Sequence, residues 1–272
     1  MISCEGDDDM KVSAAEMQVR MKSSVTTSHQ ILVTAQEVLD ITSDALSTEG
    51  ISIEDSNASP ESCAPLLINQ YIMDETHRDT IIYAGVIILD YGTGLHCSAR
   101  GAVRKGKIED LFTYIINLKN QVSFSVKQDI TFAGFNRDTI QLDGSLTSFG
   151  VTGSPDSIKI KSAKITYLNG VSIQWNGTFI NQRYRDPNSA GDIRTIKGNI
   201  TSTTSDNRFF KANVIEAITY NYDCSGSNSL VPMKGKVKII ENDWHALVDY
   251  GDGSCDRTCT VTIGDNQVIY NF

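Results

Sequence analysis

The sequence predicts an all-β protein of antiparallel, sandwich-like sheets with one N-terminal helix after a flexible lipidated tether. Three observations support this fold class. After Pro60 apolar and polar residues alternate with period two, which is typical of strands that bury one face. Strong turn sequences separate these segments, and no helical periodicity lies between them. Strand therefore follows strand directly, which favours antiparallel pairing.

The N-terminal segment reads Met-Ile-Ser-Cys-Glu-Gly-Asp-Asp-Asp. A small residue, Ser3, and an aliphatic residue, Ile2, precede Cys4, as at the cleavage site of a bacterial lipoprotein signal, after which the cysteine is acylated. The alternative is a disordered acidic N-terminus with an incidental cysteine. We expect residues 1–27 to form a lipoprotein N-terminus and polar tether, anchored in the outer membrane by its acyl chains.

Residues 28–60 are predicted to form one helix and a linker. Apolar residues between Ser28 and Leu46 fall mostly at helical spacing. Thr27 and Gln30 resemble a capping box, and Gly50 can end the segment. We expect this helix to pack on the β structure that follows.

The remaining chain is predicted to form two related β halves, residues 61–150 and 151–272. In the segment 158–161, Ile158 and Ile160 alternate with lysines. Leu168-Asn169-Gly170-Val171 predicts a hairpin with a type I′ turn, because asparagine and glycine tolerate positive φ best. Thr204-Ser205-Asp206-Asn207 predicts another hairpin connection.

A repeated sequence segment relates the two halves. Ile88-Leu89-Asp90-Tyr91-Gly92-Thr93-Gly94 recurs as Leu247-Val248-Asp249-Tyr250-Gly251-Asp252-Gly253, each followed by a cysteine. The structural interpretation is a strand leading into a glycine-dependent turn, in which the aspartate caps backbone N–H groups. The alternative is a calcium site formed by Asp249, Asp252 and Asp256, but only the second copy carries these three carboxylates.

The chain has six cysteines, which is ordinary for an exported protein. With Cys4 lipidated, five remain. Their distribution suggests one disulfide in each half, Cys63 with Cys97 and Cys224 with Cys255, leaving Cys259 unpaired or competing for Cys224. A zinc site at Cys255 and Cys259 is disfavoured because no second pair of ligands lies nearby.

Charge and motifs exclude several functions. The net charge is -9, from 24 basic and 33 acidic residues, and no basic patch is evident, so we expect no nucleic-acid partner. The four histidines, at positions 29, 77, 96 and 245, are far apart in the sequence, and no metalloprotease, hydrolase-elbow or phosphate-loop motif is present. We therefore expect no enzymatic activity.

Aromatic side chains offer a platform on which a glycan could stack. The candidates are Trp175, Tyr184, Tyr220, Tyr222, Trp244 and Tyr250. Trp175, Tyr220 and Tyr222 each lie an even number of positions from apolar residues of the same predicted strand. Their side chains are therefore expected to point toward the core. Trp244 lies between Asp243 and His245 near a predicted turn and is the best candidate for an exposed ring.

The C-terminal segment Val248-Asp249-Tyr250-Gly251-Asp252-Gly253-Ser254-Cys255-Asp256 and the following strand resemble a signature of Bacteroidetes lipoproteins of unknown function. The Asp90-Tyr91-Gly92 turn, the 104–108 segment Arg-Lys-Gly-Lys-Ile and the acidic run after Cys4 are also similar to that group. The resemblance covers roughly residues 60–272, and Cys259 departs from it. It implies an outer-membrane lipoprotein facing the cell exterior.

The function expected from these observations is a non-enzymatic surface module for binding, adhesion or structure, with an unidentified glycan or protein ligand. The alternative is a glycan-binding accessory protein that uses calcium. A hydrolase ranks third. No other cofactor is expected. A dry groove with an exposed Trp244 would favour a glycan, a pocket of converging carboxylates and histidine would favour an enzyme, and smooth sheets without a cleft would favour a structural role.

Overall fold

The computed structural model describes residues 14–48, 66–74, 79–96, 103–119, 123–137, 140–151, 153–185, 192–221 and 231–271. One helix, α1 (Ala14–Thr48), precedes fourteen strands in this part of the chain. They are β1 (Leu66–Asp74), β2 (Thr80–Asp90), β3 (Leu95–His96), β4 (Val103–Asn117), β5 (Ser123–Arg137), β6 (Ile140–Val151), β7 (Asp156–Tyr167), β8 (Ser172–Arg185), β9 (Asp192–Thr204), β10 (Phe209–Asn221), β11 (Val231–Glu241), β12 (Trp244–Asp252), β13 (Thr258–Ile263) and β14 (Asn266–Asn271).

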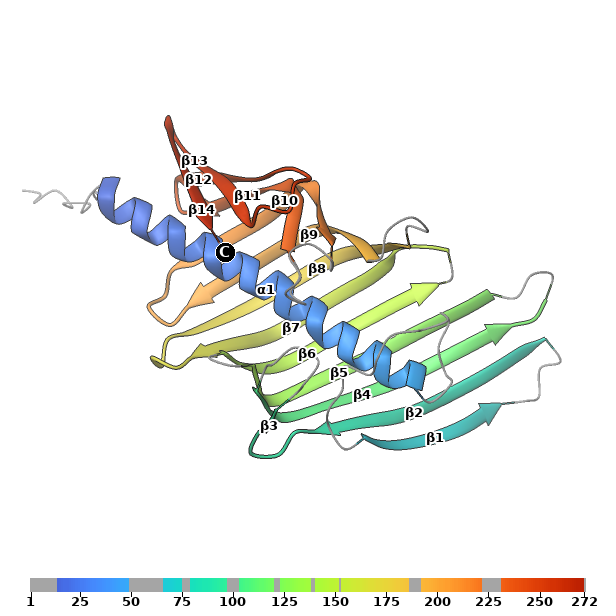
Figure 1. Ribbon diagram of the computed structural model, residues 1–272. Coiled ribbons are helices and arrows are strands. Elements are labelled where there is room, and N and C mark those ends of the chain that lie inside the picture. Colours follow the sequence, from blue (N-terminus) through green and yellow to red (C-terminus); the bar gives the residue numbers. More distant parts are fainter. Residues whose placement is uncertain are drawn as a thin grey trace, which may run out of the picture.

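The strands form one antiparallel sheet in which neighbours follow almost in chain order, from β1 to β14, with β3 paired only to β4. The all-β prediction with one helix is confirmed. The second layer that a sandwich requires is here supplied by α1, which lies across one face of the sheet (Figure 1). We call the face that α1 covers the inner face and the opposite face the outer face.

The sheet also joins the two predicted halves. The proposed boundary at residue 150 falls at the end of β6, and β6 pairs with β7 from Ile140 opposite Tyr167 to Phe149 opposite Ser157. Apolar side chains of α1 and inward residues along the sheet form one buried core. Its members include Ile31, Val38, Ile130, Ile160, Trp175, Ile200, Phe210 and Val248.

Helix α1 begins at Ala14, so the prediction that residues 14–27 belong to a flexible tether was wrong. Met21 and Val25, four residues apart, are buried against the sheet and extend the apolar stripe toward the N-terminus. Thr27 lies inside the helix and is buried, so it does not cap the helix. The Ser- and Thr-rich composition concealed this half of the helix, because such residues are usually solvent-facing.

Both predicted hairpins are confirmed, but the first uses another turn. Gly170 has φ of +81° while Asn169 is not among the residues with positive φ, and a type I′ turn requires both. Gly170 donates its N–H to the carbonyl of Tyr167, and Tyr167 donates its own N–H to the carbonyl of Val171. This pattern is that of a type I turn followed by a left-handed glycine.

The two Asp-Tyr-Gly turns have the predicted structure. Asp90 Oδ1 accepts the N–H of Gly92 at 2.8 Å, and Asp249 Oδ1 accepts that of Gly251 at 3.0 Å. Gly92 and Gly251 have φ of +54° and +88°, a region that β-carbons disfavour. The tyrosines between them, Tyr91 and Tyr250, are buried in the core.

Candidate functional site

The inner face joins α1 to the sheet through buried polar pairs. Arg104 on β4 donates from Nη2 to Glu37 Oε1 of the helix at 3.0 Å, and the two side chains are only 1% and 2% exposed. Six residues further along β4, Asp110 accepts the Gln128 amide at 2.7 Å, and the same amide lies 3.4 Å from Thr42 Oγ1. These contacts fix the C-terminal half of α1 over β4 and β5.

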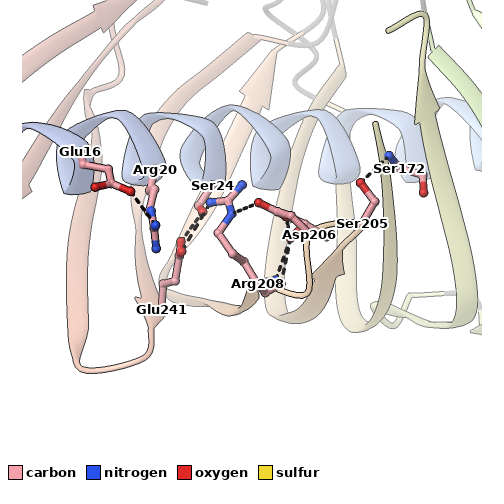
Figure 2. A network of polar contacts seen from close by, with 9 residues as sticks. Glu16, Arg20, Ser24, Ser172, Ser205, Asp206, Arg208 and Glu241 are labelled. Atoms are coloured by element: carbon pink, nitrogen blue, oxygen red, sulfur yellow. Dashed lines mark hydrogen bonds and ion pairs between the residues drawn. The ribbon is translucent and has the colours of Figure 1, made fainter. Parts of the chain in front are cut away.

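The N-terminal half of α1 is held by a second polar network, drawn in Figure 2. Ser24 donates to Glu241 Oε2 at 2.9 Å, and the other oxygen of Glu241 accepts from Arg208 at 3.4 Å. Arg208 also donates to Asp206 in the turn between β9 and β10. Between these networks, Tyr167 donates its hydroxyl to Gln30 at 2.6 Å.

Burial changes the titration of two groups on the inner face. Desolvation raises the pKa of Asp110 to about 7, an effect that the Gln128 hydrogen bond only partly offsets. Desolvation lowers the pKa of His29 to about 4. Its ring centroid lies 6.5 Å from that of the buried Tyr250. The carboxyl of Asp110 is therefore mainly protonated below about pH 7, and the imidazole of His29 is mainly neutral above about pH 4.

The interface between α1 and the sheet leaves little space for a ligand. A cavity with about 10 Å³ of accessible volume lies between them, which is about the room that one water needs. Its lining is apolar except for one glutamine. The residues are Leu32, Ala35, Gln36, Leu39, Ile158, Phe179 and Ile196. The inner face is therefore a packed interface.

The outer face, by contrast, presents polar side chains in rows that run across the strands. The strand registers place Lys159, Thr178, Asn199, Asn213 and Lys238 in one continuous row from β7 to β11. We call this the first row. A second row beside it contains Lys161, Asn176, Thr201 and Lys211. Both rows point outward because the intervening strand residues, such as Ile160 and Ile200, are buried in the core.

A bulge in β7 shapes the space between the rows. The register with β8 shifts between Ile160 and Ala163, and Ser162 has φ of +52°. Its N–H is accepted by Asn176 Oδ1 at 2.8 Å. Over this region lies an open groove of about 190 Å³. The groove is lined by Lys159, Ile160, Lys161, Asn176, Gly177, Thr178, Asn199 and Thr201.

Exposed apolar residues border the rows on both sides. Phe149 is 48% exposed, and the register places it opposite Ser157, which is in turn opposite Ile180, 49% exposed. On the other side Phe209 is 45% exposed, and Lys211 Nζ lies 5.6 Å from its ring centroid. The outer face therefore combines hydrogen-bonding groups, ammonium groups and flat apolar surfaces on one rigid sheet.

Among the candidate platform aromatics whose side chains the structure describes, most lie in the core. Trp175, Tyr220 and Tyr250 are buried, as their parity predicted for the first two. Trp244 is exposed, as predicted. However, Trp244 shares parity with Ala246, which is buried on the inner face, and so does not belong to the polar rows. The side chains of Tyr184 and Tyr222 lie outside the described residues.

The three aspartates of the calcium hypothesis do not converge. Each one instead accepts a backbone N–H two residues further along the chain, at Gly251, Ser254 and Thr258 respectively. Within the described residues no group of three or more His, Cys, Asp or Glu side chains could hold a metal ion. The proposed site at Asp249, Asp252 and Asp256 therefore lacks the geometry that calcium requires.

The cysteines are only partly described. Cys255 is disulfide-bonded, to a partner outside the described residues, and its Sγ lies 3.7 Å from Met233 Sδ. Cys259 is free and buried, and burial raises its thiol pKa to about 12. The other predicted cysteines, Cys4, Cys63, Cys97 and Cys224, lie outside the described residues.

Within the described residues, the histidines form no metal site either. His29 is on α1, while His245 on β12 is exposed. His77 and the side chain of His96 lie outside the described residues.

Comparison with known proteins gives no relative. No family model, no curated protein and no solved structure matches this chain. Among the described residues, no helix has the length and apolar character needed to cross a membrane.

The polar rows were missed at the sequence level. Four successive strands each carry an outward polar pair two residues apart: Lys159 and Lys161, Asn176 and Thr178, Asn199 and Thr201, and Lys211 and Asn213. This repeated pair was the available signal. Its alignment across the sheet depends on strand register, which bulges shift and which local patterns do not determine.

Proposed function

We propose that this chain is a non-enzymatic binding module of a surface lipoprotein, and that the outer face of β7–β11 binds a glycan. The observation that carries the proposal is the pair of polar rows over an open groove. Amide and hydroxyl groups both donate and accept hydrogen bonds, which suits the hydroxyl groups of a sugar. Because these side chains stand on a hydrogen-bonded sheet, they are preorganised for binding.

The dimensions of the rows favour a polymer over an enclosed small molecule. Neighbouring strands lie about 4.8 Å apart, close to the length of one sugar unit in an extended chain. Each step across the first row, from Lys159 to Lys238, therefore offers one polar side chain to one unit. Phe149, Ile180 and Phe209 border the rows with apolar surface that suits the less polar faces of sugar rings.

The groove itself supports a binding role over hydrolysis. Glycoside hydrolysis ordinarily uses two carboxyl groups on either side of the scissile bond. The eight residues that line the groove include lysines, asparagines and threonines but no aspartate, glutamate or histidine. The groups present can orient a sugar but cannot serve as this acid and base pair.

The proposed location is the outer membrane, facing the exterior, with the protein anchored by acylated Cys4. The support is the Ile2-Ser3-Cys4 sequence, the acidic residues after it and the resemblance to Bacteroidetes lipoproteins. Replacing Cys4 with alanine in the protein expressed with a lipoprotein signal should abolish palmitate labelling and release it from membranes. Labelling that persists would contradict the anchor.

A structural role is the second candidate, supported by the edge strand β14. This strand pairs with β13 on one side, and Val268 and Ile269 are 39% and 70% exposed. Its six residues include no charge and no proline, the features that ordinarily protect sheet edges. Concentration-dependent association that Ile269→Lys abolishes would favour this role.

Binding to a panel of soluble polysaccharides, measured by affinity electrophoresis, tests the glycan proposal. The double variant Asn199→Ala with Asn213→Ala removes two amides from the first row and should weaken binding by about tenfold. Asn266→Ala with Gln267→Ala removes two exposed amides from β14 and serves as the matched control. Equal weakening by both pairs, or no glycan binding by the wild type, would overturn the proposal.

A further inference from the structure

The outer face also indicates the class of glycan. We infer that the ligand is an anionic polysaccharide, carrying carboxylate or sulfate groups, that lies across the strands from β7 to β11. This inference rests on the proposed function and adds the charge of the ligand and its direction on the sheet.

The first observation is a group of lysines without acidic partners. Lys159, Lys161, Lys197, Lys211 and Lys238 stand on the outer face and are exposed. Within the part of the chain that the structure describes, none of these five forms an ion pair. Their five positive charges are therefore available to a ligand.

Other lysines of the same face form ion pairs. Lys107 on β4 pairs with Glu109 at 3.0 Å, and Lys236 on β11 pairs with Glu216 at 2.8 Å. Lys127 on β5 likewise pairs with Asp129. Lysines without such partners gather on β7, β9, β10 and β11, the strands that build the polar rows, although Lys105 on β4 also forms no ion pair within the described residues.

The composition of the chain makes this segregation more informative. The protein has a net charge of -9, so carboxylates are plentiful, yet none lines the groove. Lys159 and Lys161 project from the same side of one strand, where like charges disfavour folding slightly. Local conflicts of this kind concentrate at functional sites, where a ligand supplies the missing charge.

The arrangement of the charges sets the direction of the ligand. In the first row, lysines occupy both ends and three uncharged polar residues lie between them. The row crosses five strands, so its ends are about 19 Å apart. A polymer with acidic groups separated by several sugar hydroxyls matches this order, whereas a nucleic acid carries a phosphate on every nucleotide and calls for denser positive charge.

Titration with four probes tests the inference: polygalacturonate, dextran sulfate, neutral dextran and single-stranded DNA. We expect one or both acidic polysaccharides to bind at least about tenfold more tightly than dextran and DNA, with affinity falling as salt increases. Polygalacturonate and dextran sulfate distinguish a carboxylate from a sulfate ligand.

Two matched double variants complete the experiment. Lys159→Gln with Lys238→Gln removes the charges at the ends of the first row and should weaken binding about tenfold. Lys107→Gln with Lys127→Gln removes two paired lysines of the same face and should change it less than about twofold. Equal loss in both variants would overturn the inference.

The remaining outcomes separate the two proposals. Dextran binding that equals that of the acidic polysaccharides and is insensitive to salt would overturn the anionic inference and leave the glycan function standing. Tighter binding to DNA would overturn both, as would the absence of binding to every polysaccharide.

Discussion

The two faces of the sheet use charge in opposite ways. On β4, Arg104 and Asp110 point inward and are buried beneath α1, while Lys107 and Glu109 on the same strand point outward and pair in solvent. The inner face encloses such groups in specific contacts with the helix and with one another. On the outer face, Lys159, Lys161, Lys197, Lys211 and Lys238 are open to solvent.

This difference separates stability from binding. Buried polar groups must find partners, so the inner contacts fix where α1 lies on the sheet. Exposed lysines and amides contribute little to folding and are free to contact a ligand. We therefore expect inner-face variants to alter stability and outer-face variants to alter binding.

The largest effect is expected at the buried ion pair. Glu37→Ala leaves Arg104 charged and buried without this carboxylate, which should lower the free energy of unfolding by about 3–5 kcal/mol. Glu109→Ala removes the exposed partner of Lys107 and should cost less than about 1 kcal/mol. Urea denaturation of both variants measures the difference, and similar losses would show that the two faces do not differ in this respect.

The next effect concerns pH. Asp110 has a raised pKa in the folded state, so its contribution to stability is full below pH 3.8 and is lost as pH rises through about 7. His29 has a lowered pKa, so its contribution is present above pH 6.5 and is lost as pH falls through about 4. Between about pH 4 and 6.5 Asp110 makes the free energy of unfolding fall as pH rises, and His29 makes it rise. The two dependences should therefore nearly cancel.

Single variants should reveal how each residue makes the free energy of unfolding depend on pH. Relative to wild type, Asp110→Asn should gain unfolding free energy by up to about 1.4 kcal/mol per pH unit as pH rises from 4 to 7. His29→Gln should show the reverse trend, gaining relative stability as pH falls from 6.5 to 4. Urea denaturation at a series of pH values provides the measurement. Differences that do not vary with pH would contradict the burial of these two groups.

A smaller effect is expected at the turn glycines. Gly92 has φ of +54° and open space where a β-carbon would lie, so Gly92→Ala should cost only the backbone strain, about 1 kcal/mol. Gly106 has φ of +81°, and its β-carbon would lie 2.2 Å from the carbonyl oxygen of Gly134. Gly106→Ala should therefore lower the melting temperature more than Gly92→Ala; equal shifts would show that this crowding is relieved.

Local patterns in the sequence were sufficient for the strands and turns. The alternation at 158–161, the Asp90 and Asp249 turns and the exposure of Trp244 follow from side-chain period and from glycine or aspartate chemistry, which act over a few residues. These features could be predicted without knowing which strands are neighbours.

The N-terminal half of α1 could not be predicted in this way. Ser24 is buried because Glu241 accepts its hydroxyl, and these residues are 217 positions apart in the chain. A polar helix face becomes an interior face only when distant partners satisfy it. The polar rows have the same origin, since they exist only after four strand registers, with their bulges, are set.

The smallest effect on stability, and the sharpest test of the comparison, is expected at the outer lysines. Lys159→Gln with Lys161→Gln removes adjacent like charges and should change the free energy of unfolding by no more than about 0.5 kcal/mol, in the stabilising direction at low salt. Thermal melts at low and high salt measure it, and the stabilisation should vanish at high salt because screening already weakens the repulsion. A loss of more than about 1 kcal/mol would show that these lysines support the fold, and the division between a stabilising inner face and a binding outer face would fail.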